Sequence, residues 1–165
     1  LAPCMDINNN PENPVIGVRS YGDTAETVAA YGTAAFRGYR KGGVLSCAKH
    51  FPGHGDTAVD SHVGLPVIDK TMEELEALEL KPFRAAMEAG IPAVMGSHIL
   101  FPKLEPDNVP CTMSRRIVTG VLKDRLGFPG LVVSDCMEMD AIKKYYGTVK
   151  GVVSAMAAGV DMVVV

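Results

Sequence analysis

The sequence predicts an α/β fold of repeated βα units with parallel strands, arranged as a partial (β/α)8 barrel. Short, continuous apolar runs alternate with helical patterns, as expected for strands buried on both faces of a parallel sheet. Polar residues follow the runs, and several strand ends contributing to one site are typical of a barrel. The 165 residues form a single predicted domain, 1–165, of about five units, whereas a complete barrel takes about 250 residues.

The predicted strands are five apolar runs, and the polar residues near their carboxyl ends are candidates for a site. The runs cover residues 1–7, 44–48, 92–97, 130–134 and 160–165. The associated polar residues are Asp6, the segment 49–62, Ser97 with His98, and Ser134 with Asp135. Since the carboxyl ends of parallel barrel strands share one rim, we expect these side chains to lie near one another.

Helices are predicted between the strands from start and stop signals. The Ala-rich segment 24–41 ends at two glycines, and Thr71 with Glu74 forms a capping box. Pro82 is predicted to begin a separate helix, because proline is tolerated in a first turn but not in a helix interior. The remaining predicted helices, in chain order, cover residues 82–89, 115–126 behind Ser114, 137–146 and 149–158.

Composition excludes several classes of function. Apolar residues make up 47% of the chain and the net charge is −3, so we expect a globular domain with no nucleic-acid or membrane partner. No G-x-G-x-x-G or Walker motif follows a strand, and no cofactor is expected. The cysteines indicate free thiols in a reducing, cytoplasmic compartment, with a disulfide between strands as the alternative. They are Cys4, Cys47, Cys111 and Cys136.

The ends of the chain predict a fragment of a larger barrel. The first residue is Leu1, and the last apolar run stops at Val165. We expect the first strands and the last unit of the barrel to lie outside this chain. Open sheet edges pair with something, so missing segments or another copy in a homo-oligomer would cover them.

The segment 49–62 concentrates ionisable groups directly after an apolar run. It holds Lys49, three of the four histidines and two aspartates, which predicts an active-site loop. Lys49 and His50 can hydrogen-bond a polyhydroxylated ligand, although Lys49 can also pair with a carboxylate. His54, between two glycines, favours a structural role. The glycines and the proline make a helix there unfavourable, so the histidines are not expected to bind a metal.

Two acidic positions and one histidine carry the candidate chemistry. Asp135 ends the run 130–134 and is either a nucleophile or base, or the cap of the following helix. His62 follows Asp60 by two residues, so the carboxylate can fix the tautomer of the imidazole, which exchanges a proton near neutral pH. A solvated loop histidine is the alternative for His62. Arg19 offers a fork of donors for a ligand or for these carboxylates.

The residues of this loop carry a resemblance to a known family. The segment KHFPGHGDT at 49–57, followed by DSH at 60–62, resembles the family 3 glycoside hydrolases, in particular their β-N-acetylglucosaminidase branch (the NagZ type). Supporting stretches are APCMDIN at 2–8, NPVIGVRSYG at 13–22 and LGFPGLVVSD at 126–135. The resemblance therefore extends over most of the chain and implies a (β/α)8 barrel or a close variant.

The resemblance also implies a mechanism and roles for individual residues. It implies a retaining enzyme with a covalent glycosyl intermediate, in which Asp135 is the nucleophile and His62, oriented by Asp60, is the acid/base. The expected substrate is a carbohydrate with terminal β-linked N-acetylglucosamine, from peptidoglycan fragments. The positions that match its sugar-binding residues are Arg19, Lys49 and His50, with Asp6 and His98 as further strand-end candidates.

Two alternatives to this function remain open from the sequence. The family's earlier strands carry a sugar-binding aspartate and an arginine that would precede Leu1, so the chain could be an inactive fragment that only binds sugar or assembles. A β-glucosidase or β-xylosidase of the same family is the other alternative. The DSH segment at 60–62 argues against it, because those enzymes lack a histidine dyad in this loop.

Overall fold

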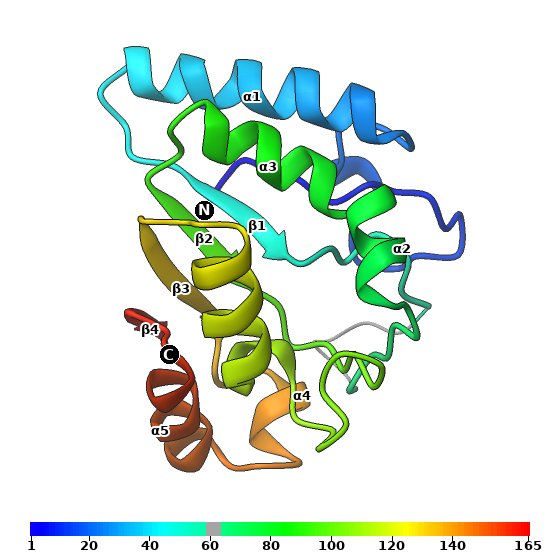
Figure 1. The fold of residues 1–165 in the computed structure, drawn as a ribbon, viewed down its shortest axis with the longest axis vertical. Helices are drawn as coiled ribbons and strands as arrows, with labels where there is room; N and C mark the ends of the chain where they lie inside the picture. The colour runs from blue at the N-terminus through cyan, green and yellow to red at the C-terminus, as the bar shows by residue number, and fades with distance from the viewer. Residues whose placement is uncertain (59–63) are drawn as a thin grey trace.

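A parallel sheet organises the molecule. The computed structural model describes residues 1–58 and 64–165. Four strands pair in chain order, each parallel to the next (Figure 1). They are β1 (Cys47–Phe51), β2 (Ala93–Gly96), β3 (Leu131–Cys136) and β4 (Met162–Val164). Parallel strands in sequential order, joined by helical connections, are the arrangement of a βα barrel, so the predicted fold class is confirmed.

The first predicted strand is only partly present. Residues 2–5 run beside β1, with Cys47 N donating to Ala2 O at 2.7 Å and Met5 N donating to Lys49 O at 2.6 Å. The segment forms one isolated parallel bridge, between Cys4 and Lys49, and no longer strand. The prediction of a regular strand over 1–7 is therefore wrong, although the segment does extend the sheet beyond β1.

The second predicted strand lies three residues further along than its apolar run indicates. Val44 and Leu45 are exposed, and the strand covers 47–51 in place of 44–48. Backbone pairing with residues 2–5 on one side and with β2 on the other carries the strand through Lys49 and His50. These two residues therefore lie within β1 and do not begin the following loop.

Helices cover one face of the sheet. In Figure 1, α1 (Ala25–Lys41) and α3 (Leu80–Glu88) lie side by side over β1 and β2. Thr24 caps α1, and the capping box of Thr71 and Glu74 opens α2 (Met72–Ala77) as predicted. The helix with Pro82 begins at Leu80, not at the proline, which occupies its first turn.

The later connections are shorter and less regular. The predicted helix 115–126 is a π-helix, η3 (Arg116–Arg125), so its carbonyls bond five residues along and not four. The predicted helix 137–146 is reduced to α4 (Asp140–Lys143). The remaining elements are α5 (Thr148–Ala158) and the 3-10 turns η1 (Gly17–Arg19) and η2 (Cys111–Met113).

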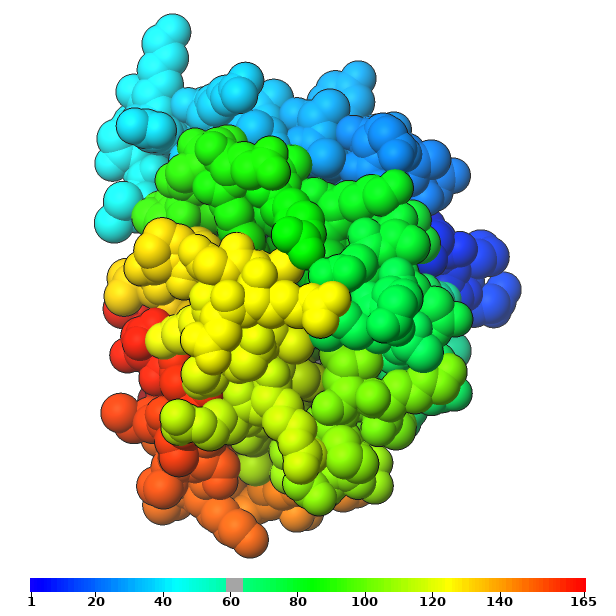
Figure 2. All heavy atoms as spheres, viewed as in Figure 1, coloured from blue at the N-terminus to red at the C-terminus, as the bar shows by residue number. Residues whose placement is uncertain are grey.

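Alternation along the strands divides the apolar residues between two faces. Ala48, Val94 and Val132 belong to the main core, which lies beneath the helices. Figure 2 shows the atoms of these helices closely packed over this face of the sheet. Cys47, Met95 and Val133 form a smaller cluster on the opposite face. No helix of the described residues is both long and apolar enough to cross a membrane.

Candidate active site

The carboxyl ends of β1 and β3 bring His50 and Asp135 together. Asp135 lies within β3, its side chain is 21% exposed, and its Oδ1 accepts a hydrogen bond from Cys136 N at 2.8 Å. His50 Nε2 lies 3.9 Å from Asp135 Oδ2. The N-cap of the following helix, α4, is Met139. The alternative that Asp135 caps this helix is therefore excluded, and its carboxylate is accessible at the end of a strand.

Asp6 is the most completely bonded side chain at this rim. It is fully buried and lies behind His50 as seen from Asp135. His50 Nδ1 bonds Asp6 Oδ2 at 2.7 Å, and the backbone N–H groups of His50 and His54 donate to the same carboxylate at 3.1 and 2.7 Å. Cys4 Sγ donates to Oδ2 at 3.1 Å. A carboxylate with this many donors is a fixed part of the site.

Burial acts on the pKa values of Asp6 and of His54 with different net results. Burial alone would raise the pKa of Asp6, but the charge and hydrogen bond of His50, with His54 adding to them, hold this pKa at about 2. Burial lowers the pKa of His54 to about 4, against the attraction of Asp6. Asp6 is therefore ionised and His54 neutral at neutral pH.

His98 is held by both of its ring nitrogens. Nδ1 lies 3.0 Å from Thr112 Oγ1, and Nε2 lies 3.0 Å from the carbonyl oxygen of Cys136. Burial lowers the pKa of His98, and its Nε2 donates to this carbonyl, which can only accept. The hydroxyl of Thr112, next to Nδ1, donates to the carbonyl oxygen of Ser97 at 2.7 Å. The structure thus gives His98 a role in holding the end of β3 next to Asp135, while a direct substrate contact remains a prediction.

Arg19 and Lys49 have fewer constraints. Arg19 is exposed at the end of η1, and its Nε and Nη2 donate to Val15 O at 3.0 and 2.7 Å. Lys49 lies in β1 and is half-buried. Within the described part of the chain, no hydrogen bond or ion pair involves Lys49 Nζ, which leaves its donors available. Sugar binding by these two side chains stays a prediction.

The predicted acid/base pair, Asp60 and His62, falls in residues 59–63 and lies outside the described residues. The residues on either side are joined by ion pairs. Lys70 Nζ lies 2.6 Å from Asp56 Oδ2 and also bonds the buried Glu79 at Oε1. These two contacts connect Asp56 and Lys70 to Glu79, the N-cap residue of α3.

Asn13 is a structural residue of the site that the sequence analysis did not single out. Its Nδ2 donates to the carbonyls of His54 and Gly55 at 2.8 and 3.0 Å, and its Oδ1 accepts from the N–H groups of Val15 and Ile16. The side chain thus ties the segment that carries Arg19 to the loop after β1. The Asn-Pro pair at 13–14 was the available signal, because it marks a turn.

One group of side chains has the composition of a metal site. Single donor atoms of Cys4, Asp6 and His50 lie within 4.8 Å of one another, and all three residues are buried. The contact of 2.7 Å between His50 and Asp6 has the length of a charge-assisted hydrogen bond. The donors are therefore directed at one another, and a hydrogen-bonded network explains the cluster better than a metal does.

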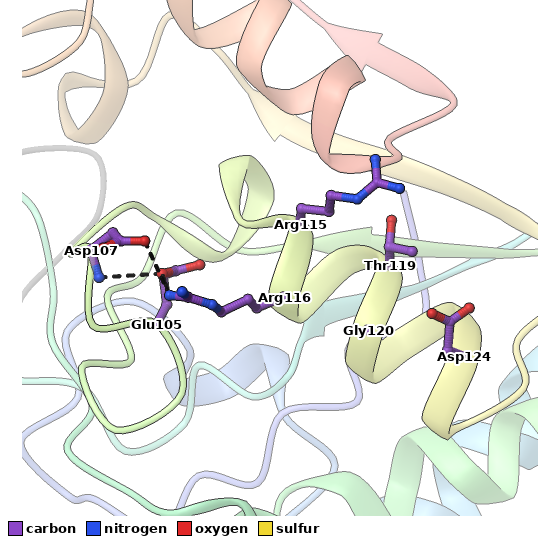
Figure 3. Close-up of a pocket in the computed structure, with 7 residues that line it drawn as sticks. All are labelled: Glu105, Asp107, Arg115, Arg116, Thr119, Gly120 and Asp124. Carbon is purple, nitrogen blue, oxygen red and sulfur yellow. Dashed lines mark hydrogen bonds and ion pairs between the residues drawn. The ribbon is translucent and has the colours of Figure 1, made fainter.

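A hollow of about 520 Å³ lies on η3, away from the strand-end residues. Figure 3 shows Arg116 directed at Glu105 and Asp107, with contacts of 2.7 and 3.1 Å, while Arg115 extends toward α5. The buried Glu105 also accepts from Ser114 Oγ at 2.5 Å. Three of the charged groups that line this hollow, Glu105, Asp107 and Arg116, are paired with one another, and the hollow holds none of the strand-end residues.

Comparison with known proteins agrees with this geometry. The sequence model of the family named glycosyl hydrolase family 3 N-terminal domain matches residues 1–165. β-Hexosaminidase A of Pseudoalteromonas piscicida is 39% identical over 98% of the chain. A family 3 β-N-acetylglucosaminidase from a Paenibacillus species superposes over the whole chain with a TM-score of 0.98 and 54% identity. NagZ of Neisseria gonorrhoeae, in complex with N-trifluoroacetyl-D-glucosamine, superposes over the whole chain with a TM-score of 0.88 and 35% identity.

The parallel βα architecture with a carboxylate and a histidine at its strand ends, together with these relatives, defines a domain of the βα-barrel class. More narrowly, the chain belongs to glycosyl hydrolase family 3. It spans 29% of the Pseudoalteromonas protein and 31% and 46% of the two solved chains, which is less than half of each.

Proposed function

We propose that this chain carries the nucleophile and the acid/base of a retaining glycosidase that removes terminal β-linked N-acetylglucosamine, with peptidoglycan fragments as the natural substrate. Asp135 attacks the anomeric carbon, and His62, oriented by Asp60, protonates the leaving oxygen and then activates water. The observation that carries the proposal is the partly exposed Asp135 at the end of β3, 3.9 Å from a histidine that a buried carboxylate holds.

The nucleophile is tested by Asp135→Asn in the full-length protein. An amide keeps the shape of the side chain but cannot form the covalent intermediate, so we expect kcat on an aryl β-N-acetylglucosaminide to fall at least about 10³-fold. Asp69→Asn is the matched control, because Asp69 is 68% exposed and its carboxylate pairs with Lys103 on the surface. More than a few percent of residual turnover in Asp135→Asn would exclude Asp135 as the nucleophile.

The acid/base is tested by His62→Ala with two classes of substrate. An activated aryl group leaves without protonation, whereas a sugar or alkyl leaving group needs the proton. We therefore expect the loss in kcat/KM to be larger for the poor leaving group. Equal losses on both substrates would argue against an acid role for His62.

The alternatives are separated by substrate and by binding. Hydrolysis of an aryl β-N-acetylglucosaminide in preference to the β-glucoside and the β-xyloside supports the proposal, and the reverse order supports the second alternative. A protein that binds N-acetylglucosamine in a titration but turns over none of the three substrates would support the inactive sugar-binding alternative.

A further inference from the structure

We propose that Asp6, which the sequence predicts as a substrate contact, is instead a positioning residue that fixes the His50 ring with Nε2 directed at the sugar site beside Asp135. This inference rests on the proposed function for its kinetic consequences. The arrangement itself belongs to the described residues and is testable without turnover.

Burial excludes direct contact between Asp6 and a ligand in this structure. Its exposed fraction is 0%, and His50, which is 4% exposed, lies between it and Asp135. The order of groups is therefore Asp6, His50, Asp135, with 2.7 Å between the first pair and 3.9 Å between the second. Asp6 therefore has no direct contact with a sugar at Asp135, and the imidazole of His50 is the group that lies between them.

The chemistry of the pair determines which nitrogen of His50 faces the site. An ionised carboxylate only accepts hydrogen bonds, so the 2.7 Å contact requires a proton on Nδ1 of His50. Nε2 is then the atom left for a ligand, as an acceptor in the neutral ring or a donor in the charged ring. Its separation of 3.9 Å from Asp135 Oδ2 is longer than a hydrogen bond, so both groups keep capacity for sugar hydroxyls.

Asp6 is itself held in place from several directions. His54 N donates to Oδ1 at 2.7 Å and Cys4 Sγ donates to Oδ2 at 3.1 Å. Ser20 Oγ, next to Arg19 in the chain, donates to the backbone carbonyl of Asp6 at 2.7 Å. A rigid carboxylate of this kind can restrict the imidazole to one orientation, which is what a positioning residue requires.

The kinetic test is a double-mutant cycle of Asp6→Asn and His50→Ala in the full-length protein. Asparagine keeps the size, and its one acceptor oxygen is favoured at the Oδ1 position, where His54 N and His50 N donate. Its NH2 group then faces His50 Nδ1 at the Oδ2 position and cannot accept the proton there, so the ring is driven to the other tautomer. We expect Asp6→Asn to lower kcat/KM by about 10- to 100-fold in the wild-type background. In the His50→Ala background the same change should lower it less than about threefold, because the residue through which Asp6 acts is gone.

Glu105→Gln is the matched control, since Glu105 is also a buried carboxylate with several donors, on η3's side of the molecule. We expect it to lower Tm while leaving kcat/KM unchanged. Additive losses from Asp6→Asn and His50→Ala would overturn the proposal, because they would mean that Asp6 acts independently of His50. A loss of kcat/KM in Glu105→Gln as large as in Asp6→Asn would also overturn it, by assigning the effect to general destabilisation.

A spectroscopic measurement covers the cases in which Asp6→Asn fails to fold or the protein has no turnover. The 15N chemical shifts of His50 in the folded wild-type protein distinguish a proton on Nδ1 from one on Nε2 alone. We expect protonated Nδ1. A neutral ring with the proton on Nε2 alone would overturn the inference about Asp6, whereas absence of glycosidase activity together with protonated Nδ1 would overturn only the proposed function.

Discussion

At the scale of single residues, the site depends on which buried polar groups have partners for their charged form. Asp6 and His54 are both almost completely buried, yet the charge and hydrogen bond of His50 keep Asp6 ionised, while burial dominates at His54 and keeps it neutral. At neutral pH, Asp6 is therefore a fixed negative charge behind His50, and His54 beside it is neutral. In the folded state, Asp6 takes up a proton only near pH 2 and His54 only near pH 4.

This difference predicts a loss of stability on mild acidification. The pKa of His54 is about 4 in the folded protein against 6.5 for the ordinary group, so only the unfolded chain takes up its proton between these values. The free energy of unfolding should therefore fall as the pH drops from 6.5 to 4, by up to about 3 kcal/mol from this residue. His98, whose pKa burial also lowers, adds a loss of the same sign. The contribution of Asp6 is lost only below pH 3.8.

Urea unfolding of the full-length protein at several pH values measures this slope. His54→Asn should be less stable than the wild type at pH 7, because it loses the contact of Nδ1 with Thr57 Oγ1. Between pH 6.5 and 4 it should lose less stability than the wild type, since one titrating group is absent. A variant with the full wild-type slope would show that His54 does not keep a lowered pKa.

At the scale of elements, the sequence predicts which segments fold but not where pairing begins and ends. The βα alternation, the capping box at Thr71 and the predicted end of the last helix at Ala158 could be predicted, because each depends on local chemistry. The position of β1 could not be predicted, because backbone hydrogen bonds with residues 2–5 decide it and an apolar run gives no sign of them. For the same reason, the sequence predicts that Asp6 and His50 lie at one rim but does not predict that Asp6 lies behind His50.

The loop after β1 provides a prediction at this scale. A Cβ on Gly55 would lie 1.6 Å from the carbonyl oxygen of Ile7, so the loop and the N-terminal segment could not both keep their positions. We expect Gly55→Ala to lower Tm strongly and to reduce kcat/KM on an aryl β-N-acetylglucosaminide at least about tenfold, since a displaced loop moves His54 off Asp6.

Gly38→Ala is the matched control for this change. Gly38 lies in α1, where an added Cβ would meet no described atom within 4 Å beyond the neighbouring backbone of the helix itself, and alanine favours a helix over glycine by about 1 kcal/mol. Gly38→Ala should therefore raise Tm slightly and leave kcat/KM unchanged. Equal activity in the two variants would show that the close approach of Gly55 to Ile7 does not position the site.

At the scale of the whole molecule, the helices of the described residues cover one face of the sheet, and part of the opposite face is open. Opposite the helices lies a hollow of about 410 Å³. It is lined mainly by apolar side chains: Leu1, Leu45, Ser46, Cys47, Pro92, Ala93, Leu131, Val133, Met162 and Val164. Leu131 and Met162 are 48% and 52% exposed there. A continuous apolar surface of this kind is rarely left open to water, so we infer that further barrel segments or a second copy covers this face.

This inference predicts different behaviour for the 165 residues alone and for the full-length protein. Alone, the chain should self-associate in sedimentation measurements and increase the fluorescence of the apolar dye ANS. Leu131→Lys should reduce both signals, because it places a charge on the open face. Tyr31→Lys should not, since Tyr31 is 63% exposed on α1, away from this face. A full-length monomer without dye binding would show that further segments cover the face, and a full-length dimer that Leu131→Lys dissociates would show that a second copy does. If the 165-residue chain stays monomeric and binds no dye, the open face is not an apolar interface.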